Sequence, residues 1–327
     1  MTLDTSLEHP FAQYVRILGK GQRGSRGLTR EEARDAMGML LDGRVEEVQL
    51  GAFLMLLRHK EESAEEMAGF TEAVRARIDA PPMAVDLDWP SYAGKRRHLP
   101  WYLLAIKCLA GRGVRTLIHG AGDHTAGRLY TEDLLQLLGI PQCRNWQEVS
   151  ATLDRHNLAF ISLGVWMPRL QHMIGLRNVL GLRSPIHSLA RLLNPLNARC
   201  GLQSIFHPGY QTIHRDAARL LGDTAIVIKG EGGEIEVNPD NPGTLYLTAA
   251  GQASDEPWPA LSSQRHMKPE RLEPAHLLTV WRGEAEDAYG ELAVQATIAL
   301  ALRGLGHGRE EAFTLARQYW AERNRSN

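Results

Sequence analysis

The feature that most constrains the fold is a change of pattern at residues 80–82, Ala-Pro-Pro. Before it the chain reads as helices. Thr29 and Glu32 have the spacing of a helix-capping box, and Ser63 and Glu66 repeat it. After it, short apolar segments alternate with helical ones, a pattern typical of a largely parallel sheet covered by helices. The sequence therefore predicts the α/β fold class, with a separate helical N-terminal domain.

The alternating part divides into elements by its apolar segments and turn residues. Strands are predicted at 85–89, 115–119, 159–163, 202–206 and 225–229, with helices between them at about 99–111, 127–138, 146–155 and 208–221. A polar, Pro- and Gly-rich stretch from 230 to 259 contains one late strand near 244–248, and helices close the chain at about 274–283, 286–303 and 309–323.

Residues 166–193 interrupt this alternation with two helix-like pieces, 167–180 and 186–193. A helical insert at this point can return to the N-terminal helices. We therefore expect two domains with a cleft between them. The helical domain comprises residues 1–80 plus about 166–195, and the larger α/β domain comprises 81–165 plus about 196–327.

Composition excludes several classes of protein. No run of 18 apolar residues is present, so no membrane span is expected. The N-terminus lacks the apolar segment of a signal peptide. The three cysteines are widely spaced and predict neither a disulfide framework nor a metal cluster. These features predict a cytoplasmic protein.

Charge is distributed unevenly although the net charge is only −1. Residues 91–130 and 164–219 together hold fourteen Lys or Arg and two acidic residues, so these two segments carry +12 and the rest of the chain −13. This asymmetry predicts a basic face opposed by acidic helices, a distribution that suits a polyanionic partner. The alternative is that the charges of these segments scatter in space.

The most basic turn lies at residues 90–98, Pro-Ser-Tyr-Ala-Gly-Lys-Arg-Arg-His, between a predicted strand and a predicted helix. Free backbone N–H groups and the positive end of a helix dipole meet at such a junction, which favours anions. Lys95, Arg96 and Arg97 add full charges. The turn therefore predicts a phosphate site, either for a small substrate or for a nucleic-acid backbone. Tyr92 and Trp101 flank it and could stack on bases.

Other polar residues follow the predicted strands. His119 ends one of them and either contacts a ligand or has a structural role. Asp123 and His124 come soon after, but no nucleophile motif accompanies them. Residues 230–236, Gly-Glu-Gly-Gly-Glu-Ile-Glu, either hold Mg²⁺ through their carboxylates or form an acidic surface turn. Arg177, Arg183 and Arg191 lie in the helical insert and either face the cleft or are ordinary exposed arginines.

Four segments, in the same order along the chain, resemble anthranilate phosphoribosyltransferase and its nucleoside phosphorylase relatives, the glycosyltransferase family 3. They are residues 41–58, His119-Gly120, 176–183 with Asn194-Pro195, and 230–237. The resemblance implies an N-terminal helical domain hinged to an α/β domain, a cleft between them, and a homodimer formed through the helical domain. It also implies that Arg177 stands where the active enzymes meet the aromatic acid.

The departures from this family are as informative as the matches. Residues 91–97 replace the Gly-Thr-Gly-Gly-Asp loop that wraps pyrophosphate in the active enzymes. The Lys and the Asn that flank the His-Gly pair are absent beside His119, and Ile235 takes the place of the Asp that precedes Glu236. Three further motifs are similar to the YbiB-type branch of the family: residues 90–94, Leu182-Arg183 with 187–191, and 204–208 with Gly209-Tyr210. This resemblance implies loss of anthranilate phosphoribosyltransferase activity and binding of nucleic acid with little sequence preference.

The sequence thus leaves two hypotheses. The first is a homodimer that binds DNA or RNA without sequence preference and needs no cofactor, no metal and no catalytic residue. Its predicted phosphate contacts are Ser91, Tyr92, Gly94, Lys95, Arg96, Arg97, His119, Arg177, Arg183 and Arg191. The alternative is a phosphoribosyltransferase with an altered acceptor, which would require Mg²⁺, with Glu236 as the remaining candidate ligand.

Overall fold

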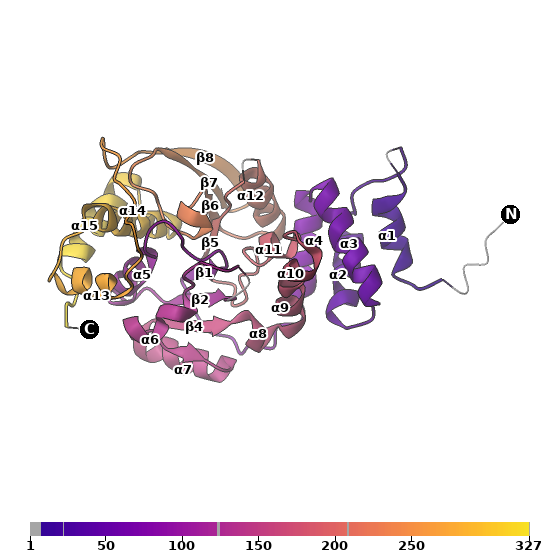
Figure 1. Ribbon diagram of the computed structural model, residues 1–327, viewed down its shortest axis with the longest axis horizontal. Helices are drawn as coiled ribbons and strands as arrows, with labels where there is room; N and C mark the ends of the chain where they lie inside the picture. Colours follow the sequence, from indigo (N-terminus) through magenta and orange to yellow (C-terminus); the bar gives the residue numbers. More distant parts are fainter. Residues whose placement is uncertain (1–7, 22, 123–124, 208, 327) are drawn as a thin grey trace.

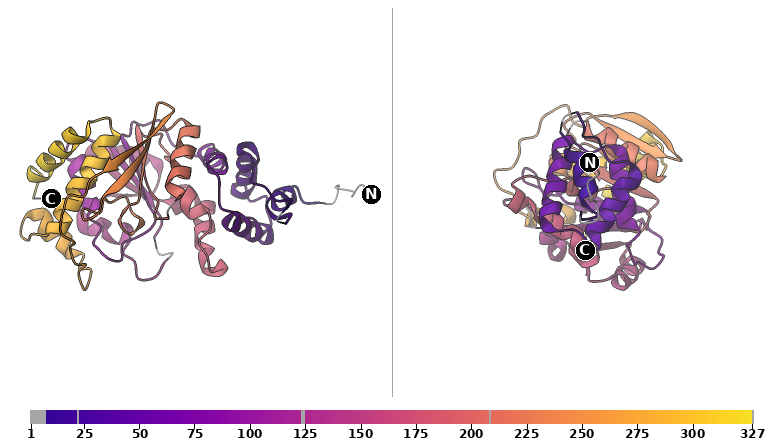
Figure 2. Two further views of the ribbon diagram at one scale, coloured as in Figure 1. Left: turned by 90° about the horizontal axis from the view of Figure 1, so that it is seen from above. Right: turned by 90° about the vertical axis from the view of Figure 1, so that its right-hand side faces the viewer.

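A computed structural model describes residues 8–326 except 22, 123, 124 and 208. The molecule is elongated (Figure 1), with the N-terminal helices at one end and the C-terminal helices at the other (Figure 2). The N-terminal helices are α1 (Ala12–Gly19), α2 (Arg30–Leu41), α3 (Glu47–Lys60) and α4 (Ala64–Arg75). Both predicted capping boxes are confirmed, since Thr29 and Ser63 each accept the N–H of the glutamate three residues on, and each glutamate accepts the cap's own N–H.

The α/β part contains one sheet of eight strands, in the order β3-β4-β2-β1-β5-β6-β7-β8. The strands are β1 (Leu87–Ser91), β2 (Thr116–Gly120), β3 (Gln142–Cys143), β4 (Leu158–Ser162), β5 (Cys200–Ser204), β6 (Ala225–Ile228), β7 (Gly243–Ala249) and β8 (Gln252–Trp258). All neighbouring strands from β3 to β6 pair in parallel. The pairs β6–β7 and β7–β8 are antiparallel. The predicted, mostly parallel sheet is confirmed.

Successive residues of a strand point to opposite faces of the sheet, so the side chains of one strand contribute to two different hydrophobic clusters. Ile118 and Phe160 join a large cluster with α5 (Tyr102–Ala110), α14 (Ala288–Gly304) and α15 (Arg309–Ala321). Leu117 and Ile161 face the other side, where α7 (Trp146–His156) packs. The sheet is thus covered by helices on both faces, as Figure 1 shows.

The remaining helices are α6 (Leu135–Leu138), α8 (Leu163–Trp166), α9 (Pro168–Gly175), α10 (Arg177–Leu180), α11 (Ile186–Leu189), α12 (Tyr210–Leu221) and α13 (Ala275–Arg282), with short 3-10 turns η2 (Glu132–Leu134) and η3 (Glu231–Gly233). The predicted helix over 127–138 is wrong in its first half. Gly127 has φ +70°, and the backbone of Leu129 forms a bridge with Lys95 instead of a helical turn. The prediction also missed β8, whose mostly exposed residues give no apolar signal.

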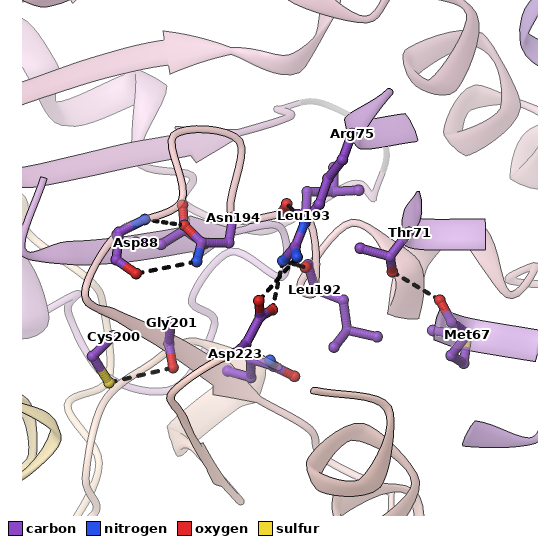
Figure 3. Close-up of polar contacts among 12 residues, drawn as sticks. Met67, Thr71, Arg75, Asp88, Leu192, Leu193, Asn194, Cys200, Gly201 and Asp223 are labelled. Atoms are coloured by element: carbon purple, nitrogen blue, oxygen red, sulfur yellow. Dashed lines mark hydrogen bonds and ion pairs between the residues drawn. The ribbon is translucent and has the colours of Figure 1, made fainter. Parts of the chain in front are cut away.

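The insert of α8–α11 packs with the N-terminal helices, where Leu170 and Leu189 share one hydrophobic cluster with Phe53. Arg75 of α4 ties this region together (Figure 3). Its guanidinium donates to the carbonyls of Leu192 and Leu193 and forms an ion pair with Asp223 at 2.6 Å. The predicted domain boundaries and the homodimer remain predictions. Within the described residues, no helix is long and apolar enough to cross a membrane.

Candidate phosphate-binding site

The carboxyl ends of β1, β2, β5 and β6 meet at one edge of the sheet, where open α/β folds bind ligands. The loop after β1 is held firmly at this edge. Lys95 and Leu129 exchange two backbone hydrogen bonds of 2.8 Å. Gly94 has φ +67°, and a Cβ there would approach Arg128 and Tyr130 to 3.0 Å. The loop therefore needs glycine at this position and has a defined conformation.

The amide groups of this loop already have an anionic partner. The backbone N–H groups of Ala93 and Gly94 donate to Oε1 of Glu234 at 2.7 and 2.6 Å. Burial raises the pKa of Glu234, and the N–H of Gly94 is the largest of the contributions that oppose this. An internal carboxylate therefore fills the position in which such amides would otherwise bind an external anion.

Lys95 does not face solvent, which corrects the prediction that it is a central phosphate contact. Its side chain is 1% exposed, and its Nζ lies 2.5 Å from Oε1 of Glu236. The other oxygen of Glu236 accepts the N–H of Tyr102 at 2.9 Å, at the start of α5. A buried ion pair forms here because neither charge is tolerated alone in the interior. Glu234 and Glu236 are both fully buried, so the alternative of an acidic surface turn is also wrong.

Several other predicted contacts lie behind the surface. The hydroxyl of Tyr92 is 2.7 Å from Nδ1 of His119, and Nε2 of His119 lies 3.2 Å from Asp88. These three side chains are at most 2% exposed. Trp101 is also 2% exposed, so neither it nor Tyr92 can stack on a base in this conformation. Ser91 and Gly94 are buried as well. His119 therefore has the structural role that the sequence left open, because its ring satisfies two buried polar groups.

Arginines gather where the helical insert meets the loops of the sheet edge. Burial lowers the pKa of Arg183 to about 10, and three neighbouring positive charges contribute to this shift. These charges belong to Arg128, Arg177 and Arg191. We call these four residues the arginine cluster. Gly181, with φ +72°, ends α10 and turns the chain. Arg183 and Arg191, which follow this turn, therefore join the arginine cluster together with Arg177, which precedes it.

The members of the arginine cluster differ in their contacts. Arg128 donates to the carbonyls of Ala93 and Gly94 at 3.0 and 2.9 Å, and Arg177 donates to the Thr125 hydroxyl at 3.0 Å. Within the described residues, Arg128, Arg183 and Arg191 have no acidic side chain at ion-pair distance. Arg191 is 8% exposed and donates to the carbonyl of His187. This corrects the prediction that Arg191 contacts phosphate directly.

Four of the ten predicted contacts thus remain accessible: Arg96 and Arg97 are exposed, and Arg177 and Arg183 are half-buried. Sequence reasoning missed Arg128, although it belongs to the first basic segment, because it lies in residues that were predicted as a helix. Asp123 and His124 lie outside the described residues.

Comparison with known proteins identifies the scaffold. Residues 13–78 match the model of the glycosyl transferase family helical bundle domain. The chain is 30% identical over 239 residues to the uncharacterized protein YbiB of Escherichia coli (strain K12), covering 70% of this chain and 73% of that protein. It is also 30% identical over 232 residues to anthranilate phosphoribosyltransferase of Desulforudis audaxviator, covering 70% and 67%.

Solved structures agree with this assignment at the level of the fold. Anthranilate phosphoribosyltransferase from Saccharomyces cerevisiae, in complex with PRPP and Mg, superimposes with a TM-score of 0.75 and 17% identity, covering 97% of this chain and 95% of that one. The architecture is therefore that of a glycosyltransferase of this type. The chain belongs to the glycosyl transferase family that includes anthranilate phosphoribosyltransferase.

Proposed function

We propose that this chain uses the phosphoribosyltransferase-like scaffold to bind the phosphate backbone of nucleic acid without sequence preference. The observation that carries the proposal is the arginine cluster. Burial lowers the pKa of Arg183 to about 10, and the positive charges of Arg191, Arg128 and Arg177 add to this effect. Gathering like charges costs free energy unless an anion is bound among them. Guanidinium groups suit phosphate because their planar fork donates two hydrogen bonds at once.

Two exposed cations follow on the loop whose Ala93 and Gly94 carbonyls accept hydrogen bonds from Arg128 of the arginine cluster. Arg96 and Arg97 follow the buried Lys95 directly and point to solvent from the same loop. Neither forms an ion pair with an acidic side chain in the described part of the chain. Long side chains at several separated points suit a repeating polyanion better than one small phosphate compound.

The second candidate is phosphoribosyl transfer to an altered acceptor, and the comparisons with named relatives favour it. The yeast anthranilate phosphoribosyltransferase has been solved in complex with PRPP and Mg. Arg177 of the arginine cluster, which donates to the Thr125 hydroxyl, supports this candidate. Its guanidinium could bind the carboxylate of an acidic acceptor substrate.

The residues of this chain do not fit a magnesium ion at Glu236. Both carboxylate oxygens of Glu236 already have donors, namely the Lys95 ammonium and the Tyr102 N–H. The preceding Ile235 offers no oxygen from its side chain. A cationic ammonium group therefore stands next to the carboxylate that would bind Mg²⁺, and we derive no step through the metal.

One titration separates the two candidates. Fluorescence anisotropy with a labelled single-stranded oligonucleotide, between about 50 and 200 mM salt, should show affinity that falls steeply as salt rises. Calorimetry with PRPP, with and without Mg²⁺, is the parallel measurement. Oligonucleotide binding with this salt dependence, and no Mg²⁺-dependent PRPP binding, supports the first candidate. Tight Mg²⁺-dependent binding of PRPP without oligonucleotide binding overturns it in favour of the second.

A further inference from the structure

A second feature of the sheet edge takes no part in the arginine cluster. A groove of about 1180 Å³ runs from the loop after β1 to the segment between β8 and α13. Its lining includes Phe206, two residues beyond β5, and Lys229, directly after β6. Because β5 and β6 are parallel neighbours, their carboxyl ends bring these two side chains to the same place.

Phe206 is exposed for a residue of its type. Its side chain is 54% accessible, and Nζ of Lys229 lies 5.5 Å from the centre of its ring. A large aromatic ring in contact with water has an unfavourable hydration free energy, which a planar ligand would relieve by stacking. Because the Lys229 ammonium lies over one face of the ring, a planar ligand would stack on the other face. The same ammonium group would supply the charge for a phosphate attached to that ligand.

The charges that line the groove favour an anion. Four cations face it: Arg97, Lys229, Arg265 and Lys268. None of them forms an ion pair with an acidic side chain among the described residues. The two acidic residues of the lining are engaged internally, since Asp240 accepts two hydrogen bonds of 2.7 Å from His266, and Glu231 accepts the side-chain amide of Asn238 at 3.0 Å.

We infer that this groove binds a single-stranded segment of nucleic acid, with a base stacked on Phe206 and phosphates at Lys229 and Arg97. Single strands suit the groove because only an unpaired base exposes its face to a protein ring. Arg97 belongs to the same loop as Arg96, so the groove continues from the exposed cations of the proposed phosphate site. The inference deepens the proposed function and rests on it.

The test compares two probes of equal length on the full chain, an oligothymidylate and the same oligomer without bases. Phe206→Leu should weaken binding of the oligothymidylate about tenfold and leave the abasic oligomer unchanged, because only the first can stack. Phe206→Tyr should retain wild-type affinity. Lys229→Gln should weaken both probes and reduce the salt slope by about 0.7, the value for one phosphate of a single strand. Met267→Leu, a change at a side chain that is 92% exposed in the same groove, is the matched control.

Two outcomes separate this inference from the proposed function. If wild-type protein binds neither probe, the proposed function fails. If it binds both, and Arg183→Gln weakens binding while Phe206→Leu does not, the proposed function stands and the groove assignment is overturned. A thymidine mononucleotide is the third probe. Binding of the mononucleotide that depends on Phe206, without tighter binding of the oligomer, would overturn the assignment to a strand and indicate a free nucleotide.

Discussion

The buried ion pair and the arginine cluster both involve the loop after β1, through Lys95 and through the Arg128 bonds to Ala93 and Gly94, but only the ion pair contains a counter-charge. Lys95 is 1% exposed and is matched by Glu236 at 2.5 Å. Arg183 is half-buried among like charges, with no acidic side chain at ion-pair distance in the described residues. A run of cations in the sequence therefore does not define a site. In this molecule Lys95 has a structural partner, whereas Arg183 is the candidate for an external anion.

The strongest way to test this contrast is to remove the matched charge. Lys95→Met leaves the buried Glu236 carboxylate without its cation, so we expect the free energy of unfolding to fall by about 3–5 kcal/mol. Urea denaturation measures this. Arg96→Gln is the control on the adjacent exposed residue and should change stability by less than about 0.5 kcal/mol. Equal losses in the two variants would contradict the contrast.

A second matched charge, Arg75, should give a smaller loss. Arg75→Ala leaves the Asp223 carboxylate, which is 7% exposed, and two backbone carbonyls without their donor (Figure 3). We expect a loss of about 2–3 kcal/mol in thermal or urea unfolding. Arg199→Ala is the matched control, because Arg199 pairs with Asp86 but is 67% exposed, and its loss should lie at about 0–1 kcal/mol. Comparable losses would show that burial does not govern these pairs.

The pH dependence of stability tests how an ionisable group responds to burial near the arginines. Burial, with a smaller contribution from Arg191, lowers the pKa of His214 to about 3. The folded protein therefore keeps this ring neutral, while the unfolded chain takes up a proton near pH 6.5. Stability should be complete above pH 6.5 and fall by about 1–2 kcal/mol between pH 6.5 and 5. Unfolding curves of His214→Gln should fall less over that range; an unchanged slope would contradict the assignment.

The smallest effect on stability is expected where a charge is unmatched. Arg183→Gln removes a cation that its neighbours repel, so the free energy of unfolding should stay within about 0.5 kcal/mol of the wild type or rise slightly. Oligonucleotide affinity should fall, and the salt slope should decrease by about 0.7, as for one phosphate contact. A large loss of stability without a change in the salt slope would assign Arg183 to the structure instead of the ligand.

Much of the fold could be predicted from the sequence because it depends on local pattern. The capping boxes at Thr29 and Ser63 and the apolar segments of β1, β2 and β4 to β6 carry their own signals. β8 could not be predicted in this way because its side chains are mostly exposed and carry no apolar pattern. Its strand conformation depends on hydrogen bonding to β7. The segment 127–131 was predicted as helix because its bridge to Lys95 comes from residues more than thirty positions away.

The candidate site was predicted less completely, and for the same reason. The two basic segments identified the arginines, and Arg96, Arg97, Arg177 and Arg183 remain accessible in the structure. The partners of Lys95 and of the Ala93 and Gly94 amides could not be foreseen, since Glu236 and Glu234 follow about 140 residues later in the chain. No local pattern reports a contact of that sequence separation.

The sequence by itself determined the class of fold and the two basic segments, because periodicity, capping and local charge are properties of neighbouring residues. The family followed from the resemblance of its motifs. Only the tertiary structure decided which charges are available. Folding brought Glu236 to Lys95 and left Arg183 among arginines, and it placed Phe206 beside Lys229 at the ends of two parallel strands. The physical reason is that a charge acts on a ligand only when no counter-charge in the fold neutralises it.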